Sequence, residues 1–179
     1  MKLETERLII RPIKPDDKYE LFDYRSDAES NKYQGWVPKS IADVELFIDG
    51  VSKHPDEPET WFQVVLIEKE RQKLIGDIGI HFFGKENKQA EIGFTLSKAY
   101  QKKGYAKESV ERIIDYLFED LNKHRIIAST DPQNENSIGL LEKIGFRKEA
   151  HFIKSLFLND HWVDDVVYAM IEDDWKKLH

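Results

Sequence analysis

Three strand-like segments separated by short breaks, with a long helix after them, restrict the fold of this chain most. The segments TWFQVVLIEK, KLIGDIGIHFF and QAEIGFTLS span residues 60–69, 73–83 and 89–97. The breaks between them, EKERQK and GKENK, are polar and short enough for hairpins, so the three strands are predicted to pair antiparallel. An amphipathic helix over residues 104–121 and the short apolar segment RIIAST then predict a strand–helix–strand crossover.

The remaining segments add helices early in the chain and strands at its end. Residues 6–13 alternate in polarity and end at prolines, which predicts a first strand. Helices are predicted from Pro15 and from Ser40, with Ser40 as the N-cap and Gly50 near the end. A further helix and two final strands are predicted at residues 134–146, 151–160 and 161–171. We therefore expect one domain over residues 1–179, of the α+β class, with a mixed, mostly antiparallel central sheet flanked by helices.

Composition restricts the class of protein. Of the 179 residues, 40% are hydrophobic and 34% are charged, an ordinary globular balance, and the formal net charge of −7 does not suit wholesale nucleic-acid binding. The absence of cysteine excludes disulfides, thiolate metal sites and a cysteine nucleophile, and no two histidines have metal-ligand spacing. No apolar run approaches the roughly 20 residues of a membrane span, and no signal-peptide pattern opens the chain. We expect a cytoplasmic protein without a metal.

The predicted long helix begins with an excess of positive charge, although the helix dipole favours negative charge at that end. Its start contains Gln101, Lys102, Lys103, Gly104 and Lys107. The first N–H groups of a helix lack intrahelical partners, so a glycine-bearing turn before them forms an anion site. The spacing differs from that of a P-loop and of a dinucleotide fingerprint. The alternative to an anion site is an exposed helix start with solubilising lysines.

The segment AEIGFTLSKAYQKKGYAKES resembles the fourth strand and pyrophosphate loop of GNAT-type N-acetyltransferases, whose loop pattern is Q/R-x-x-G-x-G/A. NENSIGLLEKIGFRKEA resembles the segment that follows in that family, LETERLIIRPI the opening strand of its RimJ/RimL-like branch, and WVDDVVYAMIEDDW the closing strand. The resemblance covers nearly the whole chain in the right order. It implies a GNAT-like fold, acetyl-CoA as the co-substrate, and direct transfer of an acetyl group to a primary amine in a ternary complex.

The resemblance also assigns residues to the coenzyme. The backbone N–H of Leu96 would bind the thioester carbonyl or the pantetheine, and Asn134 and Ser137 match coenzyme-contacting residues of the family. The residues implied to bind around the pyrophosphate are Gln101, Lys102, Lys103, Gly104, Tyr105, Ala106 and Lys107. Asn134 and Ser137 are also well suited to the start of a helix, which is the alternative role for both.

Glu91 is the candidate general base, because it lies on the strand that leads into the loop, where several GNAT branches place a glutamate. It would act on the amine directly or through water; the alternative is a carboxylate that pairs with a lysine or lines a solvated cleft. Many family members carry a tyrosine at the position of Leu141, which protonates the leaving thiolate. Leucine cannot do this, so the acid would be Ser137, water or no group. The missing tyrosine leaves a second hypothesis open, a non-catalytic acyl-CoA-binding or interaction module.

The acceptor is predicted to bind near Tyr33, Gln34 and Trp36, between the two early helices. Aromatic side chains there either frame an amine-bearing substrate or pack into the core. Asp164 and Asp165 either attract a cationic acceptor or lie at a solvated strand end. The net acidity favours a cationic acceptor, either a small molecule or a protein N-terminus, and neither a nucleic acid nor a membrane is expected as a partner. A homodimer is left open.

Overall fold

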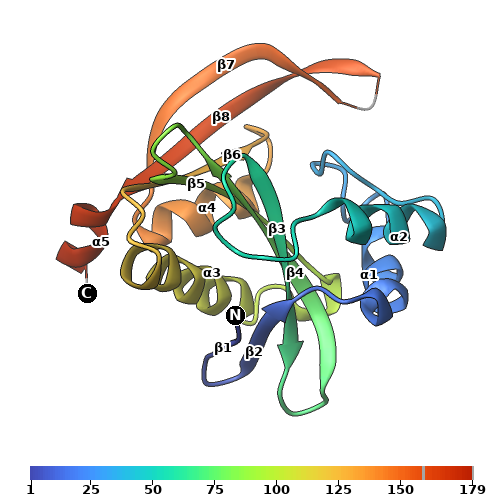
Figure 1. Ribbon diagram of the computed structural model, residues 1–179. Helices are drawn as coiled ribbons and strands as arrows, with labels where there is room; N and C mark the ends of the chain where they lie inside the picture. Colours follow the sequence, from blue (N-terminus) through green and yellow to red (C-terminus); the bar gives the residue numbers. More distant parts are fainter. Residues whose placement is uncertain (159, 179) are drawn as a thin grey trace.

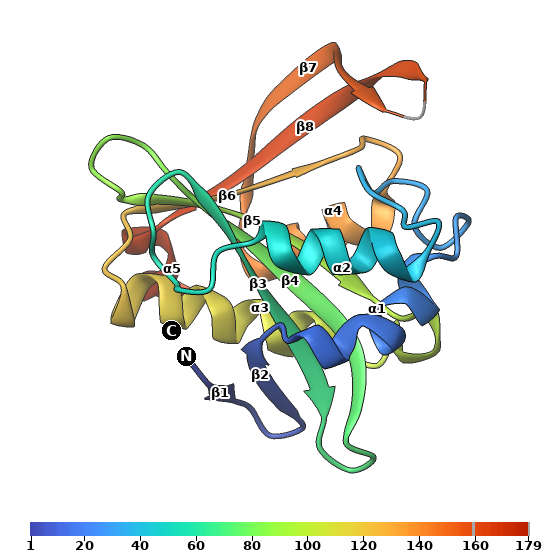
Figure 2. The same ribbon diagram turned by 45° about the vertical axis from the view of Figure 1, so that its right-hand side comes forward.

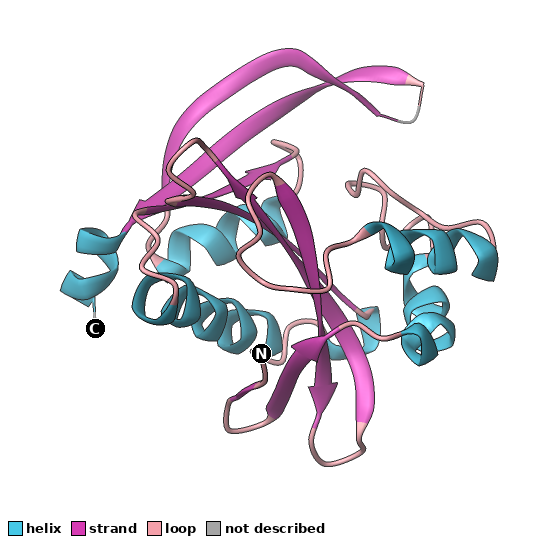
Figure 3. Ribbon diagram, in the orientation of Figure 1, coloured by secondary structure: helices cyan, strands magenta, loops and turns pink. Residues whose placement is uncertain are grey.

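The computed structural model describes residues 1–158 and 160–178. In this part of the chain, one eight-stranded sheet has the order β1-β2-β3-β4-β5-β6-β8-β7, and β5–β6 is its parallel pair. The strands are β1 (Leu3–Glu4), β2 (Leu8–Pro12), β3 (Thr60–Glu68), β4 (Lys73–Phe83), β5 (Gln89–Leu96), β6 (Arg125–Thr130), β7 (Arg147–Leu158) and β8 (His161–Ile171). The predicted α+β class with a mixed, mostly antiparallel sheet is confirmed (Figures 1 and 3).

Helices lie on both faces of this sheet. They are α1 (Lys18–Arg25), α2 (Ile41–Gly50), α3 (Tyr105–Asp115), α4 (Glu135–Ile144) and α5 (Glu172–Leu178), with short turns η1 (Pro15–Asp17), η2 (Lys98–Tyr100) and η3 (Tyr116–Asp120). Figure 1 shows α1 and α2 on one side of the central strands and α3 and α4 on the other, and Figure 2 shows α1 and α2 in front of the strands. Ser40 caps α2 as predicted, since its Oγ accepts a hydrogen bond from the N–H of Asp43 at 3.2 Å.

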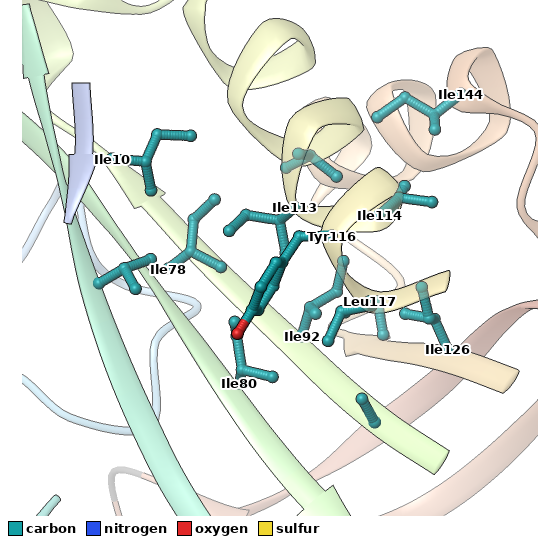
Figure 4. Close-up of a cluster of buried hydrophobic side chains, with 14 of the residues drawn as sticks. Ile10, Ile78, Ile80, Ile92, Ile113, Ile114, Tyr116, Leu117, Ile126 and Ile144 are labelled. Atoms are coloured by element: carbon teal, nitrogen blue, oxygen red, sulfur yellow. The ribbon is translucent and has the colours of Figure 1, made fainter. Parts of the chain in front are cut away.

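The two faces of the sheet bury separate apolar clusters. Helix α3 and its extension η3 pack onto β4, β5 and β6, and the buried side chains there include Ile78, Ile80, Ile92, Ile113, Ile114, Leu117 and Ile126 (Figure 4). On the opposite face, α1 and α2 bury Leu21, Val44 and Ile48 in a cluster with Val65 of β3. Each fully buried side chain of this size contributes about 1.5–3 kcal/mol, so both helix layers are firmly attached to the sheet.

The crossover from β5 through α3 to β6 produces an opening in the sheet. Strands β5 and β6 pair only from Gln89 to Glu91 against Arg125 to Ile127. Beyond Glu91, β5 continues to Leu96 in regular antiparallel register with β4, so its other edge is left without a neighbouring strand. Parallel strands that separate at their carboxyl ends form the place where open α/β sheets commonly bind ligands.

The long helix ends differently from the prediction. Residues 116–120 form a π turn, in which the N–H of Leu121 bonds the carbonyl of Tyr116 at 3.1 Å. Three consecutive side chains, Tyr116, Leu117 and Phe118, are buried here, at 9%, 0% and 2% exposure. An α-helix turns consecutive side chains by about 100°, and the wider π turn keeps more of them on the core side.

The C-terminal region also corrects the sequence prediction. Strand β7 begins at Arg147, four residues before the predicted start, and ends at Leu158. The predicted strand, residues 151–160, includes residue 159, which lies outside the described residues. The final strand predicted over residues 161–171 is confirmed as β8. The end of the segment that resembles the closing strand of the family, residues 172–175, lies in α5 instead. Acidic residues Glu172, Asp173 and Asp174 open α5 and two lysines close it, which is the charge order that the helix dipole favours. None of the helices described is long and apolar enough to cross a lipid bilayer.

Candidate active site at the diverging strands

A pocket of about 550 Å³ lies where β5 separates from β6. It is bounded by the segment 29–34, the end of β5, the turn before α3 and the first turns of α4. Of the residues predicted from the sequence, those that line it are Tyr33, Gln34, Leu96, Gln101, Lys102, Gly104, Ala106, Lys107, Asn134 and Ser137. Tertiary folding thus brings together segments that are about 100 residues apart in the chain.

The turn before α3 presents the helix N-terminus to the pocket. Gly104 is the N-cap residue and has φ of 86°, in the left-handed region that glycine adopts without strain. The side chain of Gln101 donates a hydrogen bond to the carbonyl of Leu96 at 2.9 Å, which fixes the turn against the end of β5. The N–H groups of the first helical turn have no partners within α3, so the turn offers donors to an anion.

Lysines surround this helix N-terminus. Those that line the pocket are Lys32, Lys98, Lys102, Lys107 and Lys143, against one acidic residue, Glu29. The ammonium of Lys107 also contacts the Glu111 carboxylate at 2.5 Å. Positive side chains and helix N–H groups on one wall favour an anionic ligand such as a phosphate ester.

Lys103 and Tyr105 lie outside the lining of the pocket. The Lys103 ammonium donates to the carbonyl of Ala99 at 2.7 Å, and its own carbonyl accepts a hydrogen bond from Arg7 at 2.9 Å. The guanidinium of Arg7 lies 4.2 Å from the ring centre of Tyr105 and pairs with Glu108 at 2.6 Å. These contacts tie the turn to the strand region at Arg7, so both residues support the shape of the turn.

Backbone N–H groups of β5 point into the opening. The N–H of Ser97 bonds the carbonyl of Ile75 on the β4 side, at 2.8 Å. Successive N–H groups of a strand point to opposite edges, so those of Phe94 and Leu96 point away from β4, where β6 is no longer paired. The resemblance predicts that the N–H of Leu96 binds the coenzyme. The N–H of Phe94 was not among the predicted groups, although counting alternate residues back from Leu96 would have identified it.

Glu91 lies beside the opening, on the face opposite α3. Its neighbours Ala90 and Ile92 are buried in the α3 cluster, so alternation directs Glu91 to the other face, where its side chain is 28% exposed. Burial raises the pKa of Glu91, the charge of Asp165 adds to the rise, and His81 and a hydrogen bond with Ser129 oppose it. The nearest cation-forming group is His81, whose Nδ1 is 4.0 Å from the Glu91 carboxylate. A carboxylate with a raised pKa is a better proton acceptor than a free glutamate.

The start of α4 forms the opposite wall. The side-chain oxygen of Asn134 accepts a hydrogen bond from the N–H of Ser137 at 3.3 Å, so Asn134 caps this helix while it lines the pocket. Leu141 is 1% exposed and belongs to the α3 cluster, while Leu140 lines the pocket. The side chain at residue 141 is therefore directed into the core and away from the pocket.

The two aromatic residues predicted to bind the acceptor differ in position. Tyr33 lines the pocket. Trp36 stacks on Phe47 of α2, with 4.5 Å between ring centres, and lies 5.9 Å from the guanidinium of Arg25. Trp36 is therefore packed against α2, which is the alternative role that the sequence suggested. In residues 1–158 and 160–178, no group of three or more histidine or carboxylate side chains is arranged to hold a metal ion.

Together these features form a pocket with a positively charged wall, suited to an anionic ligand, at the point where a parallel strand pair opens. The chain belongs to the GNAT acetyltransferases, because residues 7–147 match the family model described as Acetyltransferase (GNAT) domain. An uncharacterized N-acetyltransferase of Bacillus subtilis, YnaD, is 34% identical over 98% of this chain and 99% of its own. The [ribosomal protein uS5]-alanine N-acetyltransferase of Escherichia coli is 25% identical over 98% of this chain and 93% of its own. The crystal structure of a GNAT-family acetyltransferase from Bacillus anthracis superposes with a TM-score of 0.85, at 31% identity, over 97% of this chain and 99% of that one.

Proposed function

We propose that this protein is an acetyl-CoA-dependent N-acetyltransferase of the RimJ/RimL-like branch, and that it acetylates a primary amine by direct transfer in a ternary complex. The observation that carries the proposal is the pocket of about 550 Å³, which joins a lysine-rich helix N-terminus to the unpaired edge of β5. The pyrophosphate of the coenzyme would bind at the turn from Lys102 to Lys107. The pantetheine would extend along β5.

The unpaired N–H groups of β5 suit the acyl arm. We assign the N–H of Phe94 to the thioester carbonyl and that of Leu96 to a pantetheine amide. Phe94 is three residues from Glu91, about 10 Å along the strand, and Leu96 is five residues away, about 16 Å. If the N–H of Phe94 binds the thioester carbonyl, the reacting carbon lies closer to Glu91 than it would if the N–H of Leu96 bound it. A fixed N–H aimed at the developing oxyanion is a large stabilising contribution in acyl transfer.

Deprotonation of the amine is the main chemical demand. An alkylamine with a pKa of about 10.4 is neutral in only about one molecule in ~10³ at pH 7, which corresponds to about 4.6 kcal/mol. Over a distance of about 10 Å, Glu91 would accept the proton through water. The open space beside Gly93, where an added Cβ would meet nothing within 4 Å, leaves room for the amine and for water. The amine nitrogen then attacks the thioester carbon, and the C–S bond breaks.

The leaving thiolate needs little help from an acid, because a thiol of this kind has a pKa of about 8.5. Many family members carry an acid, a tyrosine, at the position of Leu141, but in this chain that residue is a buried leucine, which cannot protonate the thiolate. Ser137 lines the pocket and is assigned mainly to holding the coenzyme, with water as the proton donor. Transfer to an amine, read as the mass gain of one acetyl group, distinguishes this enzyme from a non-catalytic acyl-CoA-binding module.

The coenzyme site is tested by Gly104→Glu. For the unchanged protein, acetyl-CoA at 100-fold its Kd should stabilise the fold by about 2.7 kcal/mol, measured as a rise in Tm. Glutamate at residue 104 places negative charge and bulk against the phosphates, so the rise should disappear.

Gly104→Asn is the matched control, because asparagine tolerates the left-handed conformation of Gly104 and carries no charge. It should keep most of the coenzyme-induced rise in Tm. If folded Gly104→Glu keeps the full rise, the turn before α3 is not the coenzyme site.

A further inference from the structure

Within residues 1–158 and 160–178, no ion pair involves the buried carboxylate of Asp165 on β8. Asp165 is 9% exposed; burial raises its pKa, and the Ser129 hydroxyl lowers it. Its neighbour Asp164 instead bonds His151 at 2.8 Å and the N–H of Lys154 at 2.9 Å. The interpretation of a solvated strand end is therefore wrong for Asp165. A buried carboxylate is costly unless a cation or several donors satisfy it.

The register of the sheet places Asp165 on the same face as Glu91. Glu91 of β5 pairs with Ile127 of β6, and Ile127 pairs with Ala169 of β8. Paired residues share a face and alternate residues of a strand do too, so Ser129 and Asp165 lie on the face of Glu91. The two carboxylates thus lie on either side of the β5–β6 opening.

Ser129 of β6 lies on the same face as the two carboxylates, and its hydroxyl lowers the pKa of each. A hydroxyl has one proton to donate, so Ser129 cannot act as a full donor to both carboxylates at once. His81 is too far from Glu91, at 4.0 Å, for a good hydrogen bond. The cluster is therefore short of donors and of positive charge.

A second observation points to a polar ligand at this face. Thr95 is 8% exposed, and its hydroxyl has no hydrogen-bond partner among the residues that the structure describes. It lies on the face of Glu91, four residues further along β5, and it lines the pocket. Gly93 lies between them without any atom within 4 Å of the position of an added Cβ. The face thus has open space bounded by groups that need hydrogen bonds.

We propose that Asp165, together with Glu91, selects the acceptor as a primary alkylammonium ion, with Asp165 contributing the specificity for positive charge. The inference rests on the proposed function and names its substrate class. An ammonium group has three N–H donors and one positive charge, which matches two carboxylates that share a single hydroxyl donor. Glu91 subsequently accepts a proton from the ammonium through water, and Asp165 remains as the counter-charge that attracted it.

Binding of a charged probe and of its neutral analogue tests this specificity directly. The probes are 1,4-diaminobutane and 1,4-butanediol, titrated calorimetrically into the protein loaded with coenzyme A. The diamine should bind at least about 10-fold more tightly than the diol, a difference of about 1.4 kcal/mol. Asp165→Asn should abolish this preference. In turnover with the diamine it should raise the acceptor KM by about 10-fold or more and leave the coenzyme KM within about twofold.

Asp164→Asn is the matched control, since it changes the adjacent carboxylate, which bonds His151 on β7. It should leave both KM values unchanged, and Asp165→Glu should restore part of the preference for the diamine. Equal binding of the two probes by the unchanged protein, or an unchanged preference in folded Asp165→Asn, overturns the inference. Failure of the proposed function gives a different result, in which the diamine binds through Asp165 but no acetyl group is transferred.

Discussion

Two adjacent aspartates in β8 show how position decides the chemistry of a residue. Asp164 is held by His151 and by a backbone N–H, which lower its pKa, whereas burial raises the pKa of Asp165. Glu91 resembles Asp165, because burial is the largest influence on its pKa. The groups that face Glu91 from neighbouring strands are His81 of β4, Ser129 of β6 and Asp165 of β8. A raised pKa suits the proposed role of Glu91, because it brings the carboxylate closer to the proton affinity that a general base needs at neutral pH.

Replacement of Glu91 by glutamine should lower kcat by about 10²-fold at pH 7, because glutamine cannot accept the proton of the ammonium. The loss should become smaller as the pH approaches the pKa of the amine, about 10.4, since the acceptor is then already neutral. In the unchanged protein, kcat/KM should rise as the pH increases through the raised pKa of Glu91, which must be deprotonated to act. Steady-state kinetics from pH 4.5, the ordinary pKa of a glutamate, to about 10 measure both effects.

A loss that is equal at every pH would assign Glu91 a structural role, and an unchanged kcat would remove it from the mechanism. Glu119→Gln is the matched control, because Glu119 is an exposed glutamate of η3 that does not line the pocket.

At the scale of elements, the ends of two helices serve both folding and binding. Helix α3 begins at a glycine in the left-handed conformation without a side-chain cap, which leaves its first N–H groups available to a ligand. Helix α4 has a conventional cap, in which Asn134 accepts from the N–H of Ser137. The sequence suggested both a cap and a coenzyme contact for Asn134. The structure shows the cap, and the coenzyme contact stays a prediction.

Asn134→Ala should reduce the free energy of unfolding by about 1 kcal/mol, because the N–H of Ser137 loses its acceptor. Urea denaturation measures this change through the midpoint at constant m-value. Asn136→Ala is the matched control, since Asn136 also lines the pocket but is exposed within the first turn of α4. It should change stability by less than about 0.5 kcal/mol. Equal losses in the two variants would argue against the cap as the source of the stability.

At the scale of the whole molecule, a buried polar network attaches the α1 layer to the sheet. Asp77 of β4 is 0% exposed, and its carboxylate accepts hydrogen bonds from Tyr24, from Arg25 at 2.6 Å and 3.1 Å, and from Gln63 at 2.5 Å. The guanidinium of Arg25 also lies 5.9 Å from the ring of Trp36. This network fixes the end of α1, from which the pocket segment 29–34 follows.

Asp77→Ala should destabilise the protein by about 3–5 kcal/mol, because it leaves the buried Arg25 guanidinium without a counter-charge. Urea denaturation followed by tryptophan fluorescence measures the loss. Asp23→Ala removes an exposed carboxylate from the same helix and should cost less than about 0.5 kcal/mol. A loss below about 1 kcal/mol for Asp77→Ala would show that the apolar cluster of α1 and α2 holds this layer without the ion pair.

The sequence by itself determined the order of most elements and the crossover. Period-2 alternation, polar breaks and caps act over a few residues, so β3, β4, β5, β6 and the Ser40 cap could be predicted from local patterns. The π turn at the end of the long helix and the start of β7 could not, because packing and strand pairing decide them. Tertiary structure alone decided which residues face the opening. Strand register and the separation of β5 from β6 bring residues from distant segments together. They decide the burial of Asp165, the inward position of Leu141 and the free edge of β5.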